Sequence, residues 1–324
     1  MPGWGQPLAN PASVGLDASR LGRLTAWGEQ LVADGQAPFA MSLVARHGKV
    51  AHVAKAGESN PGKPVQFDAL CRMHSMSKPV TSVALMILHE EGKFQLGDPA
   101  WKFLGEKWKP QNMRVLVPGG TSDDYETVPC ERAVTCHHLL THTAGLSYGL
   151  NPTDGRVQSS VAAQEAANPL DGIYERMGVT IHSALGPAPL STTLAQFVDK
   201  LAECPLMYQP GEKWHYSLAT DVCGMLVEAI SGMSFWEFLH TRLFVPLGML
   251  DTFFVIPPEK ADRQADVYRP GWGADGSDTA PSPTAAMTSI VNISSHDGQD
   301  FSTPHVYLIR AALLYNSFCF SRIH

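Results

Sequence analysis

The chain has 324 residues, 44% of them hydrophobic, which is long enough to bury a large core in one domain or two interleaved lobes. Its net charge of −7, its pI near 6.0 and the lack of a basic stripe argue against nucleic-acid binding. No apolar run reaches the roughly 18 residues that predict a membrane span. The N-terminus shows no secretory signal and no CxxC pair occurs among the six cysteines, so we expect a cytoplasmic protein.

The first elements predicted along the chain are a helix and a β-hairpin. Asp17 is a plausible N-cap for a helix over 17–34. Two strands are expected over 40–46 and 50–55, joined by a tight turn at His47-Gly48-Lys49. A second helix is predicted over 75–91, because apolar residues recur at helical spacing before Gly92.

The middle of the chain mixes loops with short helices. Residues 109–130 are rich in Pro, Gly and acidic residues and are expected to form an exposed loop. Helices are predicted over 135–141, 192–202, 221–230 and 234–243.

The composition changes after Pro270. Residues 271–309 hold no Lys or Arg, and 271–300 are rich in Ser, Asp, Gly, Thr and Ala, so we expect the latter to be poorly structured.

A serine and a lysine share the start of the second predicted helix. In Ser75-Met76-Ser77-Lys78, Lys78 follows Ser75 by three residues, about 4.5 Å along the axis and on the same face. The free backbone amides at a helix N-terminus attract negative charge, and a neutral lysine can take a serine proton. The plain alternative is an N-cap serine followed by a solvated lysine.

A tyrosine is the candidate for a third proton-transferring group. Tyr216, in Trp214-His215-Tyr216-Ser217-Leu218, precedes the amphipathic helix predicted over 221–230. From such a loop it could relay a proton to a leaving group. The alternative is an ordinary aromatic residue at a loop–helix junction.

Histidines at helical spacing raise a competing hypothesis of zinc binding. His138 and His142 are spaced i,i+4, with His137 adjacent to His138. No glutamate holds the place that a metalloprotease helix needs, and Thr143-Ala144-Gly145 ends the helix at once. We therefore predict no metal and no cofactor, and expect these side chains to bond to loop carbonyls.

Four sequence blocks in this order resemble the serine β-lactamase and penicillin-binding superfamily, in the branch near class C β-lactamases and family VIII carboxylesterases. They are CRMHSMSKPVTSVALMILHEEGKFQLGDPAWKFL, HHLLTHTAGL, QPGEKWHYSLATDVCGMLVEAISG and LFVPLGMLDT. The resemblance implies that Ser75 is the acyl-forming nucleophile, Lys78 its activating partner, and Tyr216 the tyrosine of the Tyr-x-Asn motif. It also implies that the Ser75 backbone amide holds the oxyanion.

The chain departs from the family pattern in two places. Leu218 replaces the Asn of Tyr-x-Asn, which favours ester hydrolysis or acyl transfer over β-lactam hydrolysis. The family's third motif, on a core strand, has only two near-matches here. One is His296-Asp297-Gly298, with His296 as a candidate substrate-binding residue, and the other is Gly271-Trp272-Gly273.

The resemblance implies an α/β fold of the α+β type, with an antiparallel sheet flanked by helices beside a mostly helical lobe. We expect 1–95 and 251–324 to form the α/β lobe and 96–250 the helical lobe carrying Tyr216. The active site is expected at the lobe boundary. Because family-like sequence stops near Pro270, we expect an incomplete sheet and a truncated or aberrant C-terminal part.

The function predicted is that of a serine hydrolase or acyltransferase that forms an acyl-serine intermediate on a small ester, amide or β-lactam. Trp214 is a candidate for lining the acyl pocket, with a core tryptophan as its alternative. The rival function is a catalytically impaired scaffold or ligand-binding protein that keeps the fold, which the incomplete third motif supports. The oligomeric state is left open.

Overall fold

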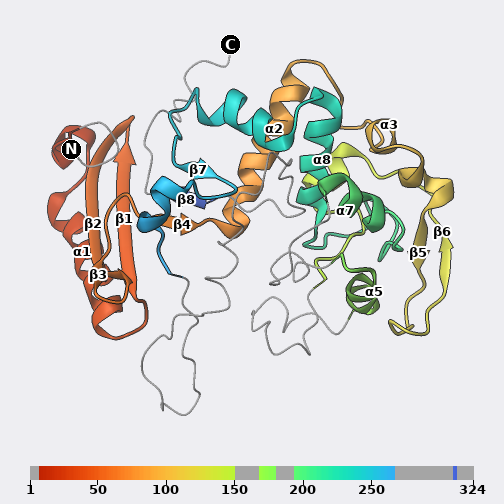
Figure 1. Cartoon of the computed structure of the whole chain (residues 1–324), viewed down its shortest axis with the longest axis horizontal. Coiled ribbons are helices and arrows are strands. Elements are labelled where there is room, and N and C mark those ends of the chain that lie inside the picture. The colour runs from red at the N-terminus through yellow and green to blue at the C-terminus, as the bar shows by residue number, and fades with distance from the viewer. Residues whose placement is uncertain (1–6, 150–167, 180–192, 267–308, 312–324) are drawn as a thin grey trace. The chain divides into compact units, whose positions relative to one another are not determined.

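The computed structural model describes residues 7–149, 168–179, 193–266 and 309–311 (Figure 1). These residues group into two compact units. The first holds the described residues of 1–73, 243–294 and 308–324, and the second holds those of 74–242 and 295–307. The predicted lobes, 1–95 with 251–324 and 96–250, stay a prediction.

In the first unit, a helix packs on a three-stranded antiparallel sheet. Helix α1 (Ala18–Ala33) covers β1 (Phe39–Arg46) and β2 (Lys49–Asn60), and the short β3 (Lys63–Pro64) completes the order β1-β2-β3 (Figure 1). The side chain of Asp17 accepts the Arg20 amide at the start of α1, so the predicted cap is confirmed.

The β1–β2 turn is the predicted tight hairpin. His47 and Gly48 both have positive φ, at 51° and 72°, as a two-residue turn that matches the strand twist requires. The hairpin therefore follows from the local sequence.

A second antiparallel sheet in this unit joins distant parts of the chain. Its order is β4-β8-β7, with β8 (Ile309–Ala311) between β4 (Leu70–Arg72) and β7 (Thr252–Phe253). The predicted mixed α and β fold with antiparallel sheets is thus confirmed. The expectations of poor structure over 271–300 and of an incomplete sheet fall on residues outside the described ranges.

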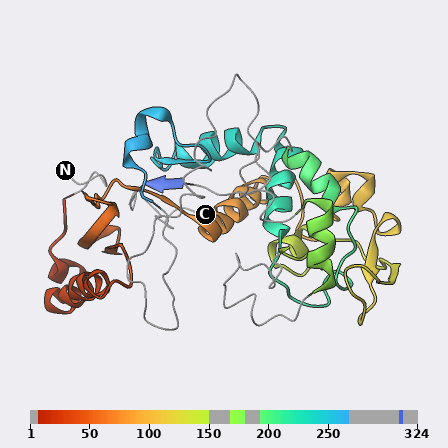
Figure 2. The same cartoon turned by 60° about the horizontal axis from the view of Figure 1, so that its bottom comes forward.

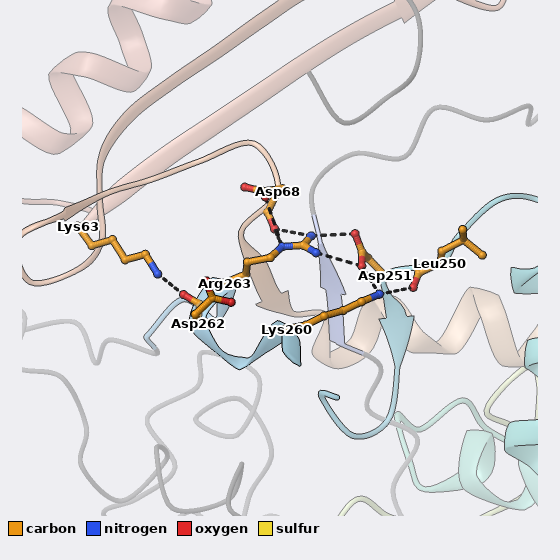
Figure 3. A network of polar contacts seen from close by, with 7 residues as sticks. All are labelled: Lys63, Asp68, Leu250, Asp251, Lys260, Asp262 and Arg263. Carbon is orange, nitrogen blue, oxygen red and sulfur yellow. Dashed lines mark hydrogen bonds and ion pairs between the residues drawn. The ribbon is translucent and has the colours of Figure 1, made fainter. Parts of the chain in front are cut away.

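A polar network connects residues that flank β7 in the sequence to the loop before β4 (Figure 3). The Arg263 guanidinium donates to both carboxylate oxygens of Asp251, at 3.2 and 2.8 Å, and to the Asp68 carbonyl at 2.9 and 2.8 Å. Lys260 Nζ donates to Asp251 Oδ1 at 2.7 Å. Burial opposes ionisation of Asp251, but the hydrogen bonds from Arg263 and Lys260 outweigh it and hold the pKa of this carboxyl below its usual value.

The second unit is mostly helical, and its core is built on two long helices. Helix α2 (Ser77–Glu90) packs against α8 (Ala219–Ser231), and the two appear side by side in Figures 1 and 2. Gly232 ends α8 in the left-handed conformation. The described part of this unit also holds five shorter α-helices: α3 (Trp101–Leu104), α4 (Cys136–Leu140), α5 (Pro169–Met177), α7 (Leu194–Leu201) and α9 (Phe235–Leu239).

The expectation of an exposed loop over 109–130 is partly wrong. Strands β5 (Arg114–Leu116) and β6 (Thr127–Pro129) pair in this segment as a two-stranded antiparallel arm, and Val115 is buried. Each strand has three residues, which is too short for a two-residue alternation to stand out in the sequence.

The last predicted helix, over 234–243, is helical over that length but changes its winding partway. Ser234 caps α9 by accepting the Glu237 amide, and a π-helical turn, His240–Phe244, continues the helix directly after Leu239. Among the described helices, none is by itself long and apolar enough to cross a membrane. Within the described ranges, one bent pair, Ala219–Ser231 with Phe235–Phe244, reaches that length and composition when its halves are combined.

Candidate active site

Ser75 lies at the entrance to α2. It belongs to a single 3₁₀ turn, His74–Met76, that leads directly into the helix, and its side chain is exposed. Lys78 lies in the first turn of α2 and is half-buried. Its Nζ atom donates to Ser75 Oγ at 3.4 Å. The predicted serine–lysine pair is therefore present in space.

Tyr216 joins this pair from a segment 141 residues away in the chain. It lies in the loop before α8, and its Oη atom is 2.8 Å from Ser75 Oγ, within hydrogen-bond distance. Lys78 Nζ lies 4.6 Å from the centroid of the Tyr216 ring. All three predicted catalytic side chains thus meet within the second unit.

A second tyrosine, which the sequence reasoning missed, borders the same site. The Tyr148 ring lies 5.1 Å from the Tyr216 ring, and Lys78 Nζ is 5.2 Å from the Tyr148 centroid. The lysine thus contacts the faces of two aromatic rings, which attract a positive charge. In the sequence, the one feature that indicates Tyr148 is its position two residues after the HHLLTHTAGL block.

A buried polar cluster bonds to the residues that flank Tyr216. Ser147 Oγ donates to Asp171 Oδ1 at 2.5 Å and lies 3.4 Å from His215 Nε2. The Ser147 carbonyl accepts the Leu218 amide at 3.0 Å, and the Tyr174 hydroxyl accepts the Ser147 amide at 3.3 Å. Burial raises the pKa of Tyr174 well above its usual value, so it serves here as a neutral hydroxyl.

The histidines of the zinc hypothesis do not converge. His138 Nδ1 accepts the Thr135 amide at the start of α4, whereas His142 Nδ1 accepts the Ser217 amide in the Tyr216 loop. The expected bond to a loop carbonyl holds for His138, whose ring also bonds to the backbone of Ala133 before α4. For His142 the expectation is wrong, because its ring bonds to a backbone amide instead. Across the described ranges, no group of three or more His, Cys, Asp or Glu residues could hold a metal ion.

The remaining predicted site residues differ in their exposure, and some lie outside the described residues. Trp214 is 63% exposed, so the alternative of a core tryptophan is wrong, and Met76 beside Ser75 is 61% exposed. Leu218 is fully buried, so the position of the family's Asn belongs to the core here. His296 and Gly271-Trp272-Gly273 lie outside the described residues.

Comparisons with known proteins show to which family the chain is related. A family model described as Beta-lactamase matches residues 24–309. Esterase EstB of Burkholderia gladioli is 32% identical over 265 residues, which make up 81% of this chain and 58% of EstB. Monacolin J acid methylbutanoyltransferase of Aspergillus terreus is 28% identical over 221 residues, 67% of this chain and 46% of the relative.

The chain is also similar to a solved structure. EstCE1, described as a hydrolase with promiscuous acyltransferase activity, matches with a TM-score of 0.61 and 26% identity, over 82% of this chain and 58% of its own. The chain spans about half the length of the curated relatives that it matches.

Proposed function

Because the chain belongs to the Beta-lactamase family, we propose that it transfers acyl groups from small esters or amides through an acyl-serine intermediate. One observation carries this proposal: Ser75 Oγ lies 2.8 Å from Tyr216 Oη and 3.4 Å from Lys78 Nζ. A serine hydroxyl between an amine and a phenol has partners both to remove its proton and to pass that proton on.

The proposed reaction has two steps. Ser75 Oγ attacks the carbonyl carbon while Lys78 takes the hydroxyl proton, and the Ser75 backbone amide stabilises the developing oxyanion. Tyr216 then delivers its phenol proton to the leaving oxygen or nitrogen as the bond from that atom to carbon breaks, and Lys78 passes the serine proton to Tyr216. In the second step, water or an acceptor alcohol attacks the acyl carbon and loses its proton to the same pair. The bond from the acyl carbon to Ser75 Oγ breaks, and the pair returns a proton to Ser75 Oγ.

Esters are the substrate class that we favour. The buried Leu218 leaves no amide side chain at the third place of the tyrosine motif. Relatives named as an esterase and as an acyltransferase support the same choice. The exposed side chains of Trp214 and Met76 flank the segments that carry Tyr216 and Ser75, and we propose that they contact the acyl chain.

Labelling of the serine tests this proposal. A fluorophosphonate should form a Ser75–phosphorus bond with loss of fluoride, and Ser75→Ala should abolish the label. Ser19→Ala is the matched control, because Ser19 is exposed and bonds only to the α1 cap residue Asp17. A folded protein that never labels would support the scaffold alternative.

The substrate class requires a second measurement. Hydrolysis of p-nitrophenyl esters should exceed hydrolysis of nitrocefin, and Ser75→Ala should remove both activities. Faster turnover of nitrocefin would contradict the preference for esters.

A further inference from the structure

His142 is joined to the Tyr216 loop by its backbone. It follows α4 and has a left-handed backbone conformation, with φ at 55°, which is uncommon for any residue other than glycine. Its carbonyl accepts the His215 amide at 2.9 Å. One residue later, the Thr143 carbonyl accepts the Gly211 amide at 2.7 Å. The strained turn at His142 thus faces the segment that carries Tyr216.

The imidazole ring of His142 makes a second connection to the same segment. Its Nδ1 atom accepts the Ser217 amide at 3.2 Å and lies 3.1 Å from Ser217 Oγ. Ser217 Oγ in turn accepts the Ala219 amide at 3.4 Å, so its own hydrogen is free to point toward Nδ1. A backbone amide can only donate, so this arrangement requires an unprotonated Nδ1.

The same ring also contacts the tyrosine itself. The His142 and Tyr216 rings lie 5.0 Å apart, with their planes inclined by 35°. The Tyr216 ring contacts Tyr148 as well, at 5.1 Å. Tyr216 is therefore held by ring contacts on its own side chain and by hydrogen bonds on both flanking residues.

We propose that His142 is a positioning residue for acyl transfer: its unprotonated Nδ1 fixes the backbone at Ser217, and thereby places Tyr216 Oη against Ser75 Oγ. This inference rests on the proposed function, because it assigns a role within that site. His142 takes no proton from the substrate and touches no reacting atom. It acts only through Tyr216.

The charges around His142 keep the ring in the state that this role needs. Burial, then the charge of Lys78 on α2, lowers the pKa of His142 to about 4, and His215 in the loop acts in the same direction. Asp221 on α8 opposes them but does not outweigh them. The ring is neutral at neutral pH. Below about pH 4 it gains a proton at Nδ1 and can no longer accept the Ser217 amide.

Two substitutions of His142 distinguish the contribution of the hydrogen-bond acceptor from that of the aromatic ring. His142→Asn places an amide oxygen near the Nδ1 position and tolerates positive φ, whereas His142→Phe keeps a ring but has no acceptor. We expect kcat for a short-chain ester to stay within about threefold of wild type in the Asn variant. We expect it to fall about tenfold or more in the Phe variant, with KM little changed, because a buried amide loses its partner.

His47 provides a matched control. It also has positive φ, at 51°, but it lies in the β1–β2 turn of the first unit. His47→Asn and His47→Phe should change the backbone preference in the same way and leave kcat unaltered.

Three readouts decide between positioning and a structural role. Adding His142→Phe to Tyr216→Phe should cause little further loss, since His142 acts through Tyr216. Wild-type labelling by the fluorophosphonate should decline with an apparent pKa near 4 while circular dichroism shows a folded chain. His142→Asn should lack that acidic decline.

The inference is overturned if the Asn and Phe variants lose activity equally, or if the losses at His142 and Tyr216 multiply. Should neither variant fold, wild-type labelling that persists unchanged to pH 3 in folded protein would overturn it by itself. These failures differ from failure of the proposed function, in which wild-type protein would not label at Ser75 at any pH.

Discussion

Replacing Tyr216 by Phe removes one oxygen atom from the proposed site and leaves the ring. The variant loses the 2.8 Å contact with Ser75 Oγ but keeps the ring contacts with His142, Tyr148 and Lys78. Because Tyr216 is half-buried and the ring stays, we expect the free energy of unfolding to change by less than about 1 kcal/mol.

The expected loss lies in the chemical step. Positioned general acid–base groups contribute about 10²–10⁴ in rate, so kcat/KM for an alkyl ester should fall by that factor, equivalent to about 3–5 kcal/mol of transition-state stabilisation. A p-nitrophenyl ester should lose less, because its phenolate leaves without help from a proton donor. The assay is therefore steady-state kinetics on a pair of esters that share one acyl group and differ in the leaving group.

Tyr125→Phe is the control, since Tyr125 is an exposed tyrosine of the arm between β5 and β6. An equal loss on both esters would show that Tyr216 does not protonate the leaving group. Unchanged kinetics on both would refute the whole account of the site.

Other predictions concern the lysine, the acyl contacts and the polar network of the first unit. Lys78→Met should reduce fluorophosphonate labelling of Ser75 by at least about 10²-fold at pH 7, and labelling at the wild-type rate would exclude Lys78 as the base. Trp214→Ala should raise KM more for a long acyl chain than for acetate, with kcat little changed; equal KM ratios for the two esters would remove Trp214 from the acyl site. Arg263→Ala should lower the free energy of unfolding in urea by roughly 1–3 kcal/mol, whereas Arg176→Ala, which breaks a well-exposed pair with Asp123, should change it by less than about 0.5 kcal/mol. Because the folded pKa of Asp251 lies below its usual value, its stabilisation is present above the pKa of the unfolded carboxyl and should be lost as pH falls through the folded pKa. Asp251→Asn should therefore flatten the acid side of a plot of unfolding free energy against pH, and an identical slope in both proteins would count against the network.

Features with local causes were predictable from the sequence. The Asp17 cap, the His47-Gly48 turn and the position of Ser75 before α2 each depend on a few neighbouring residues, and each is confirmed. The family predicted from the motif blocks is confirmed by the match over 24–309. The position of Tyr216 beside Ser75 depended on that resemblance, because no local pattern relates residues 141 positions apart.

Other parts of the site could not be predicted, for physical reasons. The acceptor role of His142 depends on a backbone amide 75 residues away. Its i,i+4 spacing with His138 raised only the zinc hypothesis, which the sequence analysis set aside. Tyr148 becomes a site residue only because Lys78 and Tyr216 lie beside it. The strands β5, β6 and β8 have three residues each, and their pairing is decided by tertiary contacts that short-range patterns do not encode.

The place of β8 between β4 and β7 sets the order in which this sheet can be assembled. The ribosome makes β4 and β7 before residues 309–311, and each of these two strands pairs with the late strand β8 rather than with the other. During synthesis, both strands therefore expose backbone groups that can pair with another nascent chain. The yield of folded protein from cells should therefore depend on chaperone supply and growth temperature. This dependence should be stronger for the whole chain than for its helical second unit alone.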